Sequence, residues 1–316
     1  MKTSHWIASL WYVSIGSVLA VFATSAQAWN SGGHRLVAGI AWEVMTPIAR
    51  QEASQLLRRH PDYPRWLSLA GDHDTERRVF IATSTWADEI RKDPRFYTPA
   101  SESPTPLLSG FPDMIRHGDW HYEARPLDEA AASAPGRPTS GAIGKGLSSQ
   151  ARELQGHDNA RRAYALPWIT HLVGDVHQPL HVSLKVDTAG NWDKLGIAQQ
   201  IHQPNTRRKP ITNLHVFWDD LPGSYKVDSK ELDVRIESLL ARHRNPPRLA
   251  SPAIWLDESW TLARQAGYPV GKGEILEITP EFLETSREIT DRRLAEAGYR
   301  LGEWLNALLG KKRVGQ

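Results

Sequence analysis

The chain has 316 residues, 40% of them hydrophobic and 23% charged, which is typical of one large globular unit or at most two. Its formal net charge of +2 excludes the broad basic field of a tight duplex binder, so any contact with nucleic acid must be local. Cysteine is absent, which excludes a disulfide framework and limits the side-chain ligands of a metal site to His, Asp and Glu.

The first 28 residues have the three parts of a secretory signal. Lys2 precedes an apolar run over residues 6–22, and Ala26-Gln27-Ala28 forms an A-x-A cleavage site. The alternative is a membrane anchor, but serines interrupt the run, which is marginal for the ~20 apolar residues of a span. We expect cleavage after Ala28, with Trp29 as the new N-terminus and no membrane association afterwards. The chain has no N-x-[ST] acceptor, which favours a periplasmic or secreted protein of a Gram-negative bacterium.

Apolar residues recur with helical period over most of the remaining chain. The pattern predicts helices over residues 34–44, 47–57, 78–91, 157–176, 213–220, 229–242, 251–265 and 280–309. Thr46 and Pro47 have the residue types of a cap and a first-turn proline. Two segments rich in Pro, Ser and Gly, 93–112 and 124–146, are predicted to be loops.

Evidence for a sheet is weak. Only residues 197–201 have a pattern that fits a short hairpin arm. The chain shows no internal repeat and no convincing linker, and its polar tail is expected to fray. We therefore predict an all-α fold, a single mostly helical domain over residues 29–316 with long loops. We expect a monomer without an obligate protein partner.

Two His–Asp pairs stand four residues apart in predicted helices. His171 and Asp175 lie in "THLVGDVHQPLH", and His215 and Asp219 lie in "NLHVFWDD". Residues four apart share one face of a helix, so each pair can direct two ligands at one ion. Imidazole with carboxylate is a common ligand mixture for zinc. One pair could equally form a surface hydrogen bond, but an unpaired Asp within the apolar stretch "LPWITHLVGD" would be costly to bury.

Other candidate ligands flank these pairs. Pro179, between His177 and His181, is expected to end the helix and let the chain turn, so His181 can face a different metal from His171. His177 is ambiguous, and a structural role is favoured for it because ligand histidines need oriented neighbours. Upstream, "WADEIR" places Asp88 and Arg91 one turn apart, and "DWHY" contains His121; each of these alone is more often structural.

Together, six segments occur in the order and spacing of the S1/P1 nuclease family, which the chain resembles. They are "WNSGGH", "WADEIR", "DWHY", "THLVGDVHQPLHVS", the "GN" of "TAGNW" and "NLHVFWD". One HxxxD motif is weak evidence, but six ordered segments are specific. The resemblance implies a helical fold of the phospholipase C/P1 nuclease type that holds three zinc ions and hydrolyses single-stranded DNA and RNA to 5′-mononucleotides, often with 3′-nucleotidase activity.

The resemblance also implies how the ligands divide among three zinc ions. Asp88, His121, His171 and Asp175 would hold one zinc, and His181, His215 and Asp219 a second. The third would be held by the amine and carbonyl oxygen of Trp29, by His34, and by Asp175 as a bridge. A terminal amine binds metal only when unprotonated, and its ordinary pKa of ~7.7–8 makes deprotonation inexpensive. These ten donor groups fall short of the roughly twelve that three closed tetrahedral sites need, which leaves open positions for water as at catalytic zinc.

Substrate contacts follow from the same resemblance. Arg91 would contact a phosphate, and Asn191 of the "GN" segment would also bind substrate. Tyr122 would stack on an unpaired base, worth ~1–3 kcal/mol per base, although plain packing beside Trp120 explains it as well. Some family members carry an Asp where this chain has Ala124, so its base preference stays open.

Two other functions compete with this interpretation. A zinc-dependent phospholipase C also begins with a metal-bound Trp, but it has a longer gap to the next His and HxxxE rather than HxxxD at the last pair. His34, five positions after Trp29, and Asp219 therefore favour the nuclease. A non-catalytic zinc-binding protein would take up metal without hydrolysis, and the open coordination positions argue against it.

Overall fold

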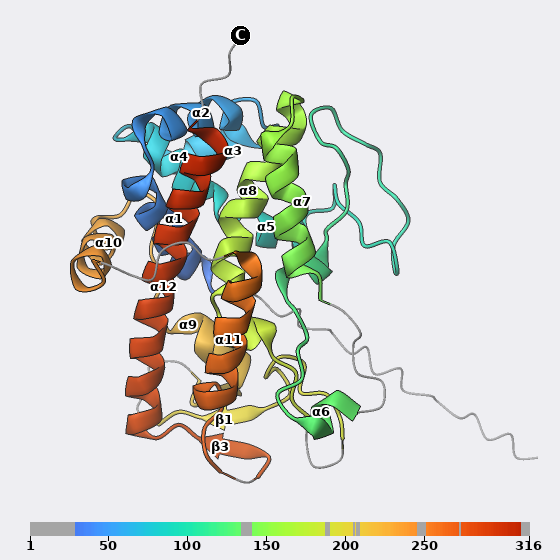
Figure 1. Cartoon of the computed structure of the whole chain (residues 1–316), viewed down its shortest axis with the longest axis vertical. Helices are drawn as coiled ribbons and strands as arrows, with labels where there is room; N and C mark the ends of the chain where they lie inside the picture. The colour runs from blue at the N-terminus through green and yellow to red at the C-terminus, as the bar shows by residue number, and fades with distance from the viewer. Residues whose placement is uncertain are drawn as a thin grey trace, which may run out of the picture.

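The computed structural model describes residues 29–133, 141–186, 190–204, 206, 209–244, 251–271 and 273–310. The described chain is a bundle of long helices with a small sheet at one end (Figure 1). The predicted signal segment and the tail beyond residue 310 lie outside the described residues. Among the described helices, none combines the length and the apolar character needed to cross a membrane.

Five helices form the body of the bundle. They are α1 (Ser31–Val44), α7 (Ile143–Gln155), α8 (Asn159–Val176), α11 (Pro252–Ala266) and α12 (Pro280–Leu309). The helix α12 runs along the length of the molecule, and α7 and α8 stand side by side (Figure 1). Close packing of α12 on α1 requires two glycines, because a Cβ on Gly298 would lie 2.5 Å from Ile40 Cβ and one on Gly302 would lie 2.7 Å from Val44 Cβ.

Further helical elements of the described residues surround this body. The remaining α-helices are α2 (Pro47–Leu57), α3 (Tyr63–Ala70), α4 (Thr75–Thr83), α5 (Trp86–Glu89), α6 (Glu129–Ser133), α9 (Leu214–Asp220) and α10 (Lys230–Arg242). Three 3₁₀ turns complete the helical set: η1 (Ile90–Lys92), η2 (Gly118–His121) and η3 (Pro179–Val182). The predicted mostly helical fold with long loops is confirmed.

A three-stranded sheet covers one end of the bundle. The central strand β1 (Gln200–His202) is antiparallel to β2 (Ile211–Asn213) and parallel to β3 (Ile275–Glu277). Ile201 of β1 is buried opposite Thr212 and Leu276. The expected hairpin arm therefore exists, but it is displaced by three residues at its start, and β3 was not predicted.

One continuous hydrophobic cluster joins the described elements from Trp29 to Leu309. Its largest fully buried side chains include five tryptophans, Trp29, Trp66, Trp86, Trp168 and Trp218. Trp29, the first described residue, has 0% exposure. Its indole therefore fixes the start of the described chain within the core.

Several predicted boundaries need correction. The prediction of one helix over residues 78–91 is wrong, because the chain forms α4, α5 and η1 instead. At the break, the hydroxyls of Thr83, Ser84 and Thr85 donate to the carbonyls three residues earlier, at 2.8, 2.7 and 3.2 Å. Such bonds compete with the helical ladder and favour a turn.

The predicted loop over residues 124–146 is also partly wrong, since it contains α6 and the first turn of α7. Gly144 and Gly146 lie in the first turn of α7, and their low helix propensity favoured the prediction of a loop there. Gly146 is required by packing, because a Cβ there would lie 3.1 Å from the Trp120 ring. The helix α3 was likewise not predicted, whereas the predicted loop over residues 93–112 contains no named helix or strand.

Candidate metal centre

Helix α8 carries the central residues of the site. Asp158 caps its N-terminus by accepting from Ala160 N and Arg161 N, and the helix is buried from Arg162 to Val176. His171 and Asp175 are both 0% exposed, and His171 Nε2 lies 3.2 Å from Asp175 Oδ2. The predicted pairing of these two residues on one helical face is confirmed.

Asp88 of α5 and His121 of η2 converge on His171. Asp88 Oδ1 lies 3.8 Å from both His121 Nδ1 and His171 Nε2. The two imidazole nitrogens are 3.1 Å apart, and His121 Nδ1 lies 3.0 Å from Asp175 Oδ2. Asp88, His121 and His171 therefore form one group whose ligand atoms lie within 4.8 Å of one another. Arg91 Nη1 is held 3.3 Å from Asp88 Oδ1.

His34 of α1 joins the other side of Asp175. Its Nε2 lies 3.4 Å from Asp175 Oδ1, and its ring stacks on His171 with centroids 3.9 Å apart. Gly174 makes this approach possible, because a Cβ there would lie 2.8 Å from His34 Nδ1. The two oxygens of Asp175 thus face different groups, as a bridging carboxylate requires.

A separate group is formed by His181 of η3 with His215 and Asp219 of α9. Their ligand atoms lie within 4.8 Å of one another. His215 Nε2 is 3.4 Å from Asp219 Oδ2, and the two imidazole rings have centroids 5.1 Å apart. The turn at Pro179 separates this group from the His171 groups, as the sequence predicted.

Backbone carbonyls orient three of the imidazoles. The Nδ1 atoms of His171, His181 and His215 lie 2.8, 2.5 and 2.8 Å from the carbonyl oxygens of Ser84, His121 and Leu195 respectively. Donation from Nδ1 fixes the tautomer that leaves the Nε2 lone pair directed at the group, which is how metal-binding histidines are oriented. Gln178 Nε2 similarly donates to Asp219 Oδ1 at 2.9 Å.

The electrostatics of the site fit a divalent cation. Burial raises the pKa of the Asp175 and Asp219 carboxyls, so the buried anionic forms are costly. Burial lowers the pKa of His34 and His121, which keeps these rings neutral as ligands must be. Burial also opposes the charging of His171, but the carboxylates of Asp175 and Asp88 outweigh it and raise its pKa.

Unpaired buried atoms supply a second test of this fit. Four atoms in the site have no hydrogen-bond partner: both ring nitrogens of His34, His121 Nε2 and Asp175 Oδ1. Orphaned polar atoms of this kind are costly unless a ligand satisfies them. His34 Nε2 and Asp175 Oδ1 are oriented as zinc ligands would be, and the His/Asp donor set suits zinc.

The start of the described chain is held by contacts with α9 and with the first turn of α1. Asn30 N donates to Asp219 O at 3.0 Å, and Asn30 Oδ1 caps α1 by accepting from Gly32 N and Gly33 N. A Cβ on Gly33 would lie 2.7 Å from Trp29 Cβ, so glycine is needed there. These contacts hold the start of the chain against α9 and one turn before His34.

Two predicted substrate residues have different surroundings. Tyr122 follows η2, is half-buried, and has none of the ring contacts found among the described residues; Trp120 stacks on His117 instead, with centroids 3.7 Å apart. Asn191 is exposed after Gly190, and it is not a member of the described ligand groups.

Residues that the sequence analysis did not identify complete the site. Gln178 lies between two ligands in the "DVHQPLH" motif, so a buried polar residue there was the available signal. Asp193, near Asn191, accepts from the Tyr268 hydroxyl at 2.6 Å and anchors that loop. His177 lies outside the three groups: its Nδ1 donates to Val173 O and its Nε2 accepts from Arg300, which fits the structural role favoured for it.

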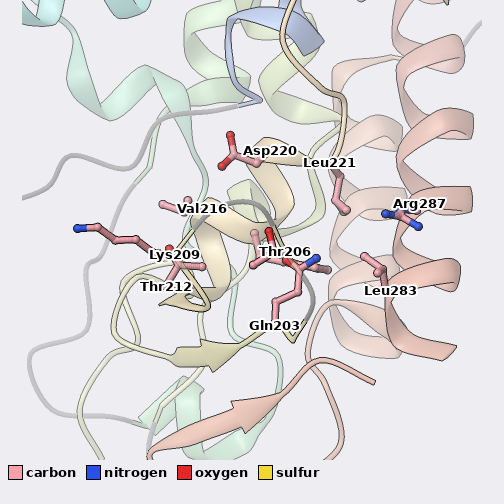
Figure 2. A pocket seen from close by; sticks show the side chains of 10 residues that line it. Gln203, Thr206, Lys209, Thr212, Val216, Asp220, Leu221, Leu283 and Arg287 are labelled. Atoms are coloured by element: carbon pink, nitrogen blue, oxygen red, sulfur yellow. The ribbon is translucent and has the colours of Figure 1, made fainter. Parts of the chain in front are cut away.

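A separate cavity of about 360 Å³ lies against the outer face of α9 (Figure 2). Val216 and Asp220 line it from α9, Lys209 and Thr212 from the preceding segment, and Arg287 from α12. His215 and Asp219 are not among its lining residues. The two faces of α9 are therefore distinct, and the candidate ligands His215 and Asp219 lie on the face away from this cavity.

Comparison with known proteins agrees with this geometry. The family model described as S1/P1 Nuclease matches residues 29–310. Similar proteins include Endonuclease 3 of Arabidopsis thaliana, 26% identical over 325 residues and 98% of each chain, and Endonuclease 2 of the same plant, 25% identical over 308 residues, 91% of this chain and 93% of the relative. Nuclease S1 of Aspergillus oryzae is 22% identical over 320 residues, which cover 93% of this chain and 96% of that protein. The chain belongs to the S1/P1 nuclease family, and it is a hydrolase that acts on the ester bonds of nucleic acids.

Proposed function

We propose that the protein is a zinc-dependent endonuclease that hydrolyses single-stranded DNA and RNA to 5′-mononucleotides and also acts as a 3′-nucleotidase. The observation that carries the proposal is the convergence of three His/Asp groups in one buried region, with Asp175 facing two of them. Family membership supports the class of reaction, and the donor set supports zinc.

The proposed zinc ligands divide as the family resemblance implies. One ion would be held by Asp88, His121, His171 and Asp175, a second by His181, His215 and Asp219, and a third by His34, Asp175 and the amine and carbonyl oxygen of Trp29. Bound zinc supplies Lewis acidity, which lowers the pKa of coordinated water to about 7 and neutralises negative charge on phosphate.

The protein's own side chains prepare this centre. The carbonyls of Ser84, His121 and Leu195 hold three imidazoles in the orientation that binding requires. Asp175, the proposed bridging and catalytic carboxylate, presents one oxygen to each of two groups. Arg91, held beside Asp88, would donate to a non-bridging phosphate oxygen.

Single-strand preference follows from base stacking. Tyr122 lies next to His121, and its ring has no ring partner among the described residues. A base can stack on it only when unpaired, so duplex substrates should be poor. Asn191 is proposed to bind the substrate from the loop after η3. Ala124 removes one acidic contact found in some family members, which leaves base preference to experiment.

We infer that export is part of the mechanism. Cleavage after Ala28 would free the amine of Trp29, and the full burial of that residue supports a fixed terminus rather than a frayed one. The mature domain would then comprise residues 29–316, located in the periplasm or the medium and acting as a monomer.

A substrate panel tests the proposed function. The purified mature protein should cleave single-stranded DNA, RNA and a 3′-nucleotide, and should cleave duplex DNA more slowly. Hydrolysis of phosphatidylcholine vesicles without nucleic-acid cleavage would instead support a phospholipase C. Zinc uptake with no hydrolysis of any substrate would support a binding protein.

A further inference from the structure

The segment after Tyr122 runs alongside the turn that carries His181. Glu123 N donates to His181 O at 2.8 Å, Leu184 N donates to Arg125 O at 2.8 Å, and Leu127 N donates to Leu184 O at 3.0 Å. These bonds continue as a parallel bridge between Pro126 and Leu184. Arg125 is therefore fixed three residues beyond the proposed stacking residue and beside the chain that leaves the metal centre.

Arg125 meets a basic and aromatic cluster on α11. Its guanidinium carbon lies 5.6 Å from the centroid of the Trp260 ring, and that of Arg264 lies 5.5 Å from the same ring. Trp260 and Arg264 are four residues apart and share one face of α11. Trp260 Nε1 donates to Pro126 O at 2.9 Å, which fixes the indole against the Arg125 segment.

The charges of this cluster are only weakly compensated. Arg125 Nη1 lies 2.7 Å from Asp257 Oδ1, but Asp257 is 64% exposed, and such a surface pair contributes little. Arg264 is exposed and forms no salt bridge with another described residue. Each guanidinium group lies against the Trp260 ring, and a phosphate bound to either one would add charge compensation that the surface pair supplies only weakly.

The basic and aromatic character continues along the same edge. Lys185, next to Leu184, places its Nζ 4.2 Å from the centroid of the Tyr268 ring. Interleaved cations and aromatic rings are the composition with which proteins bind single-stranded nucleic acid. The net charge of +2 made a broad basic field impossible, but it permits a local one of this size.

We propose that Arg125, Trp260 and Arg264 form a phosphate-binding track for the part of a single strand that extends beyond the metal centre. The proposal rests on the proposed nuclease function. It adds that the enzyme binds a longer single strand than the metal centre alone could contact. The two arginines bind successive backbone phosphates, and the indole holds both guanidinium groups in position. The track gives affinity for strand length and no base preference.

The test compares substrates of different length. Arg125→Gln, Arg264→Gln and the double variant are assayed on a single-stranded 20-mer and on a dinucleotide, across a series of salt concentrations. The matched control is Arg161→Gln, an exposed arginine paired with Glu153 at 3.3 Å at the start of α8, where α7 and α8 meet in Figure 1. Arg125→Lys and Arg264→Lys keep the charge and should retain most of the affinity.

We expect each Gln variant to raise the KM for the 20-mer more than the KM for the dinucleotide, with kcat little changed. The slope of log affinity against log salt should fall by about 0.7 per arginine, the value for one phosphate contact on a single strand. An unchanged slope, or equal effects on both substrates, would overturn the track. If the wild-type protein cleaves neither the 20-mer nor the dinucleotide, the proposed nuclease function itself is rejected.

Discussion

Two buried polar clusters lie at the C-terminal end of α8, and they differ in how their polar atoms are satisfied. The first is the metal centre. The second, the arginine network, consists of His177, Glu258, Ser259, Arg293, Glu296 and Arg300. Glu258 is partly exposed, and the other five residues are at most 6% exposed.

The arginine network is satisfied by its own residues. Arg300 donates to both oxygens of Glu258 at 2.6 and 2.9 Å, and Arg293 donates to Glu296 at 2.6 Å. Ser259 Oγ donates to Val176 O at 2.6 Å and Arg293 Nε to His177 O at 3.3 Å, which satisfies carbonyls at the end of α8. None of the unpaired buried atoms found among the described residues belongs to this network.

The metal centre is satisfied only in part. His34 Nε2 and Asp175 Oδ1, which lie 3.4 Å apart within it, have no hydrogen-bond partner. Both clusters are buried at the same helix end, so burial alone does not distinguish a structural cluster from a functional one. The unpaired atoms distinguish them, because they mark the cluster whose buried polar atoms a bound cation could satisfy.

The largest effect is expected at Asp175. The Asp175→Asn variant should lose more activity than any other single ligand variant, and more than the ~10²–10³-fold that removal of one preorganised donor costs, because Asp175 faces two groups. Steady-state kinetics on single-stranded DNA measures this loss. A greater loss in Asp88→Asn would show that the bridging assignment is wrong.

Substitutions in the arginine network should lower the free energy of unfolding. Arg300→Met leaves Glu258 without its bidentate partner and His177 without its donor, so the free energy of unfolding should fall by ~3–5 kcal/mol. Denaturant unfolding of the metal-free protein measures this change. Arg287→Met, at an exposed arginine elsewhere on α12, is the control, and an equal effect in both variants would contradict a special role for the network.

A smaller effect is expected at Gln178, which contacts the metal centre without being a proposed ligand. Gln178→Met removes the hydrogen bond to Asp219, so zinc affinity should fall by ~10–100-fold. Competition with a chelator gives the affinity, and thermal unfolding of the metal-free protein separates it from stability. Unchanged zinc binding would mean that this bond does not orient Asp219.

Cleavage of the signal segment should raise the number of bound zinc ions from two to three. A variant in which residues before Trp29 are retained should bind two zinc ions, because its amine is tied up in a peptide bond. Elemental analysis of the intact and processed proteins compares them directly. Three ions in the unprocessed form would refute the role of the terminal amine.

The last effect concerns a buried histidine that is not one of the proposed ligands. Burial lowers the pKa of His60 to about 3, below its ordinary 6.5, so the unfolded chain binds more protons between these values. Stability should therefore decrease as the pH falls from 6.5 towards 3. His60→Asn keeps an acceptor for Asp62 N and cannot be protonated, so its stability should depend less on pH over that range.

Sequence patterns predicted elements whose signals are local. The predicted bounds of α2 and α12 match the structure because Thr46-Pro47 and Thr279-Pro280 each combine a capping hydroxyl with a first-turn proline. The break after α4 was missed because it depends on side-chain bonds to the backbone at Thr83, Ser84 and Thr85. The pairing of β3 with β1, 75 residues apart, has no local signal.

The site was predicted to a similar extent. His–Asp spacing indicated the two pairs, and the order of six motifs identified the remaining ligand candidates. The structure brings the His and Asp members together. The carbonyls that orient the imidazoles could not be predicted from local sequence patterns. His171 contacts Ser84, which is 87 positions away in the sequence, and His181 contacts His121, which is 60 positions away. Those contacts depend on how α8 packs against α5 and η2, which is a tertiary property.

The most direct measurement is cleavage of single-stranded DNA by the processed protein before and after exhaustive chelation, with zinc counted per chain. The account predicts three zinc ions, loss of cleavage on their removal, and recovery when zinc is restored. Undiminished digestion by the metal-depleted enzyme would contradict it.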